Sequence, residues 1–96
     1  MDDELLKICK NALKDAIGNS IESFEITLLD FCPKSNKFTV AIEVKVGEKT
    51  YILHSCKKTL QQVTDDIVGK YNGIAFCYSQ GSLRKAREMI ERYFMQ

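Results

Sequence analysis

The chain of 96 residues has no tryptophan, a single proline, a single histidine and no long run of apolar residues. Since a transmembrane helix needs roughly 18 apolar residues in succession, the sequence predicts no membrane-spanning helix, and we expect no membrane among the partners. It also has almost no excess of charge, because 14 Lys and Arg stand against 13 Asp and Glu, for a net charge of +1. This balance predicts no strong overall field, so any contact with nucleic acid has to be local.

The four cysteines, Cys9, Cys32, Cys56 and Cys77, lie in separate segments, and none is paired with a second cysteine or a histidine at metal-ligand spacing. Residues 1–4 are acidic at three positions and lack the basic and apolar regions of a signal peptide. We therefore expect a cytoplasmic protein with reduced, mostly buried thiols and with neither a metal nor a cofactor.

The composition, 45% hydrophobic and 28% charged, is typical of a globular protein, and the length allows one compact domain over residues 1–96. Apolar residues at helical spacing predict a helix over 5–17 that ends at Gly18. Alternating residues predict strands over 24–28 and 38–46, and a third strand over 50–54.

The second half of the chain is expected to continue with helices and one more strand. Ser55 is a good N-cap for a helix that buries Cys56 and ends at Gly69. A short strand is predicted over 74–78, and a last helix from Gly81, with Leu83, Ala86, Ile90 and Phe94 on its apolar face. The fold class is α/β (α+β), a two-layer sandwich of order α-β-β-β-α-β-α with a mixed four-stranded sheet and the helices on one face.

One motif points to metal-dependent chemistry. Glu43 and Lys45 form a Glu-x-Lys on a strand, which resembles the restriction-endonuclease-like nucleases, in which such a Glu binds Mg²⁺ and the Lys helps to activate water. The hairpin register places Glu25 near Glu43. Asp30 is expected about 16 Å from Glu43 and on the opposite face. Glu25, Glu43 and Lys45 are therefore either a catalytic group or a solvated cross-strand cluster.

His54 and Cys56 are two residues apart near the expected helix start, where a thiolate is favoured. No nucleophile with an orienting third residue is evident around this histidine, so burial of Cys56 in the core is the expected role. The sequence thus assigns no catalytic residue outside the nuclease alternative.

Basic residues are concentrated at the two later helix starts. They are Lys57 and Lys58 at the first, and Arg84, Lys85 and Arg87 at the second, beside Gly81 and Ser82. Free N–H groups at a helix start, a glycine and several cations form a candidate phosphate site. The alternative is an ordinary solvated helix surface.

The stretch from Phe38 through the Gly47 turn to Lys57 and Lys58 resembles the second half of a double-stranded-RNA-binding domain. In that family a hairpin leads into a helix whose first turn carries lysines that span phosphates, and the order α-β-β-β-α is shared. The resemblance implies RNA binding by these lysines.

Residues 5–87 also resemble the small protein subunits of ribonuclease P and MRP. The features that carry this resemblance are the helix ending in Gly18, the run Tyr51-Ile52-Leu53 into an amphipathic helix, and Ser79-Gln80-Gly81-Ser82-Leu83-Arg84-Lys85-Ala86 opening the last helix. It implies a non-catalytic subunit that pairs with another small protein subunit and braces a structured RNA.

Three functions remain open at this point. The first is a non-catalytic RNA-binding or ribonucleoprotein scaffold. The second is a protein-interaction module without nucleic acid, such as a homodimer formed through a sheet edge. The third is the Mg²⁺-dependent nuclease.

Overall fold

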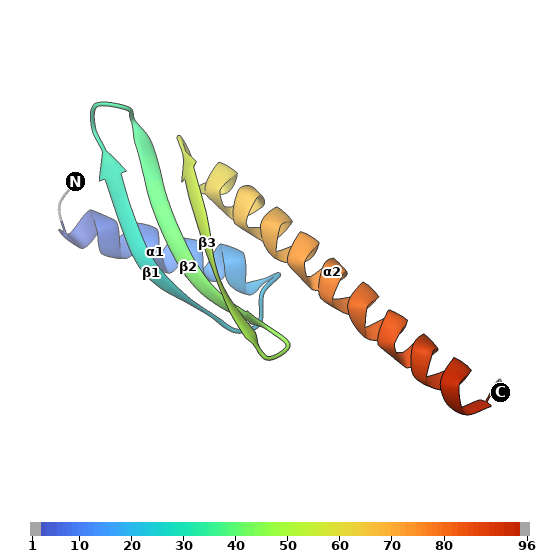
Figure 1. The fold of residues 1–96 in the computed structure, drawn as a ribbon. Coiled ribbons are helices and arrows are strands. Elements are labelled where there is room, and N and C mark those ends of the chain that lie inside the picture. Colours follow the sequence, from blue (N-terminus) through green and yellow to red (C-terminus); the bar gives the residue numbers. More distant parts are fainter. Residues whose placement is uncertain (1–2, 95–96) are drawn as a thin grey trace.

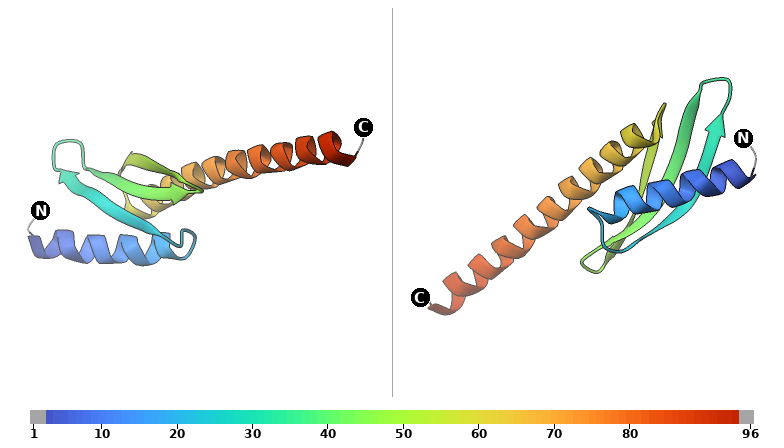
Figure 2. Two further views of the ribbon diagram at one scale, coloured as in Figure 1. Left: turned by 60° about the horizontal axis from the view of Figure 1, so that its bottom comes forward. Right: turned by 180° about the vertical axis from the view of Figure 1, so that it is seen from behind.

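The computed structural model describes residues 3–94, with the backbone alone at positions 82, 83, 86, 87, 89, 90 and 92–94. Its elements, in order, are α1 (Asp3–Gly18), β1 (Phe24–Cys32), β2 (Lys37–Val46), β3 (Lys49–Lys57) and α2 (Leu60–Phe94). The strands form one antiparallel sheet in the order β1-β2-β3, and both helices lie on the same side of it (Figures 1 and 2). The fold is therefore α+β in two layers.

The core lies between the sheet and the two helices. Alternate residues of β2 point toward the helices, as the period of two predicted. Ten buried residues form the core: Leu13, Ile17, Ile21, Ile26, Val40, Ile42, Val44, Leu53, Val63 and Ile67. All five elements contribute to this list, so one continuous core joins both helices to the sheet.

The predicted first helix is confirmed, together with its end at Gly18. Leu13 and Ile17 are buried, and the Ile17 carbonyl accepts hydrogen bonds from the N–H groups of Ser20 (3.0 Å) and Ile21 (2.9 Å). These bonds satisfy a carbonyl that the helix end would otherwise leave unpaired. The chain then enters β1 with Ile21 already in the core.

The predicted strands are confirmed in position, but β1 contains a bulge that simple alternation does not reveal. Ile26 is opposite Ile42 and Leu28 is opposite Ala41, so Thr27 is the extra residue. Its Oγ1 donates a hydrogen bond to the Ala41 carbonyl (3.2 Å). Leu28 is therefore on the outer face of the sheet, where it is 46% exposed, and not in the core.

The second helix begins later than predicted. β3 continues to Lys57, so Ser55 and Cys56 belong to the strand, and Thr59 caps α2. The Thr59 hydroxyl accepts a hydrogen bond from the Gln62 N–H (3.1 Å), one of the groups that the first turn leaves unpaired. Serine and threonine are both good caps, so local preference does not distinguish the two positions.

The second half of the chain is a single helix, α2, which continues without interruption to Phe94. The predicted helix end at Gly69, the fourth strand over 74–78 and the separate helix from Gly81 are wrong, and the sheet is not mixed. A glycine within a helix costs only about 1 kcal/mol relative to alanine, so it does not by itself end one. A short apolar run such as 74–78 fits a strand or a helix, and here the helical spacing from Ile67 continues through it.

The apolar face predicted for the last helix consists of Leu83, Ala86, Ile90 and Phe94, whose side chains lie outside the described residues. No helix in the described part of the chain is both long enough and apolar enough to span a membrane.

Tyr78 of α2 contacts the turn between β2 and β3 at Gly47. Gly47 has φ +65°, in the left-handed region that glycine adopts without strain. A Cβ on Gly47 would overlap the Tyr78 ring, so this ring packs directly on the turn backbone. Beyond Tyr78, α2 projects past the sheet (Figures 1 and 2), and the molecule has extents of 66 × 21 × 18 Å.

Candidate nucleic-acid interface

Four lysines gather at the end of the sheet where the β1–β2 turn and the start of α2 are found (Figure 1). Lys34 lies in the turn, Lys37 begins β2, Lys57 ends β3 opposite Phe38, and Lys58 follows it. Because neighbouring strands are about 4.8 Å apart, the backbones of Lys37 and Lys57 are roughly 6 Å from each other, with the Lys57 side chain on the helix face of the sheet and the Lys37 side chain on the outer face. We call Lys34, Lys37, Lys57 and Lys58 the lysine cluster.

Three members of the lysine cluster are exposed, and Lys37 is half-buried. Lys57 and Lys58 are candidates from the sequence, whereas Lys34 and Lys37 are not. The backbone preferences of residues 33–36 indicate a turn. The sequence alone gives no reason to assign a binding role to Lys34 or Lys37. The signal that could have found Lys37 is the hairpin register, which places it beside the end of the third strand.

The start of α2 adds a partial positive charge to the same end of the sheet. Thr59 satisfies the Gln62 N–H, while the N–H groups of Leu60 and Gln61 have no partner within the helix. The helix dipole places roughly half a positive charge at this terminus. The lysine cluster and the helix start therefore favour the same ligand, an anion.

One carboxylate lies near the lysine cluster on the helix side. Asp66 accepts a hydrogen bond from Lys70 Nζ at 3.2 Å. The pKa of Asp66 is lowered, first by the Ser55 hydroxyl and then by Lys70 and Lys57, against a smaller opposing effect of burial. The Ser55 Oγ is buried and makes no hydrogen bond of ordinary length and angle, so we take its contact with Asp66 to be a long one. Asp66 is thus ionised at neutral pH.

Arg84, Lys85 and Arg87 do not join the lysine cluster, because they lie in the distal part of α2. At about 1.5 Å per residue, they are roughly 40 Å along the helix from it. Arg84 and Lys85 are exposed, and the side chain of Arg87 lies outside the described residues. Gly81 and Ser82 are inside α2, where N–H groups bond to the preceding turn, so the predicted anion-binding helix start is wrong.

The residues of the nuclease alternative lie on the outer face of the sheet. Glu25 and Glu43 are direct partners across β1 and β2, which confirms the predicted register. Lys45 follows on the same face of β2, because residues two apart share a face. In the part of the chain that the structure describes, no three His, Cys, Asp or Glu residues are grouped to hold a metal ion.

Asp30 is on the same outer face as Glu43, and the predicted opposite face is wrong. The reason is the extra residue Thr27, which reverses the alternation of β1 beyond it. Asp30 is opposite Thr39, four positions along β2 from Glu43, and this corresponds to roughly 13 Å. The two carboxylates are too far apart to share an ion.

His54 and Cys56 are on β3 and not at a helix start. His54 is opposite Ala41, and its carbonyl accepts a hydrogen bond from Lys70 Nζ (2.5 Å). Cys56 is exposed, and its Sγ accepts a hydrogen bond from the Thr39 hydroxyl (3.8 Å). The expected burial of Cys56 in the core is therefore wrong.

All four cysteines are free, but most are not buried as predicted. Cys32, Cys56 and Cys77 are exposed, and Cys9 is half-buried. The pKa of the Cys32 thiol is lowered by hydrogen bonds from the Ser35 hydroxyl and from backbone groups of the β1–β2 turn. Charge repulsion from a nearby carboxylate and slight burial oppose this effect. Cys32 therefore ends β1 beside a turn whose hydrogen bonds favour its thiolate.

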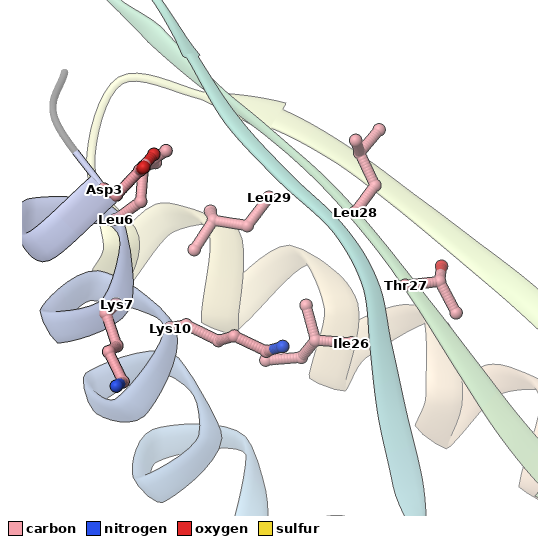
Figure 3. A pocket seen from close by; sticks show the side chains of 8 residues that line it. All are labelled: Asp3, Leu6, Lys7, Lys10, Ile26, Thr27, Leu28 and Leu29. Atoms are coloured by element: carbon pink, nitrogen blue, oxygen red, sulfur yellow. The ribbon is translucent and has the colours of Figure 1, made fainter.

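A hollow of about 350 Å³ separates α1 from the outer edge of β1 (Figure 3). Leu29 points into this gap, whereas Leu28 points to the other side of the strand. Lys10 extends along the gap toward Ile26. The hollow lies beside the bulge, where the pairing of β1 is irregular.

Comparisons with protein-family models, with curated proteins and with solved structures found no match to this chain. The proposals below therefore depend on the residues and geometry of the chain itself.

Proposed function

We propose that the protein binds structured RNA without catalysing a reaction, through phosphate contacts of the lysine cluster. The observation that carries this proposal is that four lysines, from the β1–β2 turn, the ends of two strands and the approach to α2, lie at one end of the sheet. Lys57 is on the helix face of this end and Lys37 on the outer face, so the positive charge surrounds the end of the sheet. Lysine side chains and unpaired N–H groups at a helix start are both suited to phosphate oxygens. The positive charge of the lysine cluster attracts phosphate groups to this end of the sheet, although the net charge of the chain is only +1.

The order of the elements favours double-stranded RNA as the ligand. The chain folds as α-β-β-β-α, with a hairpin that leads into a helix immediately preceded by Lys57 and Lys58. This is the order of the double-stranded-RNA-binding domains, which the sequence of this stretch resembles. Such domains recognise the shape and phosphates of A-form helices more than their sequence. The proposed ligand is therefore an RNA stem, recognised largely independently of sequence.

The direct test measures binding of a fluorescent RNA hairpin with a stem of about 16 base pairs. We compare the native chain with Lys57→Ala/Lys58→Ala and with the control Lys45→Ala/Lys49→Ala. The control removes the same charge from the opposite end of the sheet, where Lys45 and Lys49 lie beside the Gly47 turn. We expect at least about tenfold weaker binding for the cluster variant and less than twofold for the control.

Two outcomes would contradict the proposal. One is no binding of the native chain to the hairpin at low salt. The other is an equal loss in both double variants, which would show that only the total charge matters. A DNA duplex of the same sequence serves as competitor, and it should displace the RNA poorly because its groove widths differ and it lacks the 2′-hydroxyl groups.

A further inference from the structure

The distal part of α2, which we call the arm (residues 76–94), extends away from the sheet (Figures 1 and 2). At about 1.5 Å per residue it is roughly 27 Å long. Tyr78 of the arm packs on Gly47, and beyond it Gly81 and Lys85 face Glu48 and Lys49 across an open hollow of about 510 Å³. Since isolated helices of this length are marginal in water, a helix that projects in this way calls for a partner.

Five apolar residues of the arm and one serine recur at intervals of seven. Phe76, Leu83 and Ile90 form one series, and Ser79, Ala86 and Tyr93 form the second, three residues after the first. Alternating steps of three and four are the spacing of the a and d positions along which two helices pack in a coiled coil. We call these six positions the seam.

The seam is on a different side of α2 from the residues that contact the sheet. A step of 100° per residue places it on the order of 140° around the helix from Ile67, Tyr71 and Ile74, which pack in or against the core. Phe76, the first residue of the seam, is 64% exposed. Ser79 is exposed as well, so the monomer leaves the seam uncovered at the two positions whose side chains are described.

The charged residues of the arm fit the same arrangement. Arg84, Lys85, Glu88 and Glu91 are exposed, and all four occupy positions off the seam. A helix with a narrow apolar seam and charged residues on its other sides is typical of a two-helix coiled coil.

We propose that the arm pairs with the arm of a second copy of this chain, as an antiparallel two-helix coiled coil. A twofold axis between Arg84 and Lys85 would set each a position of one arm against a d position of the other. The three layers, each occurring twice, would be Phe76 with Tyr93, Leu83 with Ala86, and Ile90 with Ser79 of the partner copy.

This register makes the arm complementary to itself. Two of the layers combine a large residue with a small one, and the third combines two aromatic rings. In a parallel pair, each residue would instead face the same residue of the partner copy. The small side chains of Ser79 and Ala86 would then leave unfilled space in their layers. The pattern of sizes therefore favours the antiparallel orientation and a second copy as the occupant.

The area that the seam offers is sufficient for a reversible dimer. Five apolar residues per copy would bury on the order of 500 Å² each side, or roughly 1,000 Å² in total. That is about the lower limit for a specific interface, so we expect a reversible dimer and not a permanent one.

The sheet edges are less suited to self-association, although a dimer through an edge is the expectation from the sequence alone. At β3 the His54 carbonyl is already bonded to Lys70. At β1 the bulge at Thr27 interrupts the ladder, a feature that protects edges from pairing. The arm is the surface that both the spacing and the exposure support.

Sedimentation equilibrium between 1 and 200 μM tests the proposal with the full chain. We expect a monomer–dimer equilibrium for the native chain, and at least a tenfold higher dissociation constant for Leu83→Glu, which puts a charge in the central layer. The matched control is Cys77→Glu, an exposed position of the arm off the seam, and it should dimerise like the native chain. Circular dichroism checks that both variants keep the fold.

A native chain that stays monomeric at 200 μM would overturn the proposal, as would a dimer that Leu83→Glu leaves unchanged. Because the lysine cluster is roughly 27 Å along α2 from the arm, Leu83→Glu should leave single-site RNA affinity within twofold, so the two proposals fail separately.

The orientation has its own measurement. A spin label at Gly73→Cys, with the four native cysteines replaced by serine, measures the distance between copies. Gly73 is exposed, and a Cβ there meets no other atom within 4 Å. The antiparallel pair predicts roughly 35 Å between the labelled positions, from the helical rise and the twofold axis. A distance below about 20 Å would indicate a parallel pair and contradict the proposed register.

Discussion

Replacing Gly47 by alanine tests how firmly α2 is held on the sheet. Two costs combine at this position. A residue other than glycine at φ +65° loses about 1–2 kcal/mol. The added Cβ also overlaps the far end of the Tyr78 ring, which is 52% exposed and can turn away at a cost of about 1 kcal/mol or less. We therefore expect a loss of about 1–3 kcal/mol in the free energy of unfolding, which lowers Tm by roughly 5–20 °C in a chain of this size.

Urea denaturation followed by circular dichroism measures this loss, with Gly73→Ala as the matched control. Gly73 is in the interior of α2, and its added Cβ meets nothing within 4 Å, so this substitution should stabilise by about 0.5–1 kcal/mol. In the background of Tyr78→Ala, Gly47→Ala should cost about 1–2 kcal/mol, because only the backbone term remains. A cost below about 0.5 kcal/mol in the native background would refute the reasoning.

Three further predictions concern the start of α2 and the turn beside it. Thr59→Ala should destabilise by about 1 kcal/mol in urea denaturation, because it removes the cap of α2; no change would argue against Thr59 as the cap. Because the pKa of Asp66 is lowered in the folded chain, its contribution to stability is present above the unfolded value near 3.9 and is lost as the pH falls through the folded value. Asp66→Asn should therefore flatten the fall in Tm between about pH 5 and pH 3, and an unchanged slope would contradict this assignment. Since the pKa of Cys32 is also lowered, iodoacetamide at pH 7 should alkylate Cys32 faster than Cys77, as followed by mass spectrometry, and Ser35→Ala should reduce the difference. Equal rates for the two thiols would count against the turn as its cause.

The first half of the fold could be predicted from its sequence, because local pattern and tertiary structure agree there. The helix to Gly18 and the alternation of β2 each indicate one buried face, and the pairing of Glu25 with Glu43 follows from the hairpin turn. The bulge at Thr27 could not be predicted in the same way, since one inserted residue leaves no mark on composition and only reverses the alternation beyond it.

The second half shows where local preference misleads. Gly69 resembles a helix end and Gly81 a helix start, yet α2 passes through both, because the local penalty of a glycine within a helix is modest. The continuity of α2 also changes the candidate binding site. Once α2 is continuous, the two basic groups are no longer at two helix starts but at opposite ends of one long helix.

The lysine cluster is defined by the pairing register of β2 and β3 and not by a sequence motif. Lys57 and Lys58 are adjacent in the sequence and are easily recognised as a basic pair. Lys34 and Lys37 are twenty residues earlier, and only the pairing of β2 with β3 brings them to the same end of the sheet.

The salt dependence of RNA binding tests the central claim most directly. Four phosphate contacts to a duplex predict that the logarithm of the binding constant falls with the logarithm of salt concentration at a slope of about −3.6. Lys57→Ala/Lys58→Ala should reduce that slope by about 2, while Lys45→Ala/Lys49→Ala should leave it unchanged. Equal slopes for the three chains, or binding that does not depend on salt, would contradict a phosphate-binding role for the lysine cluster.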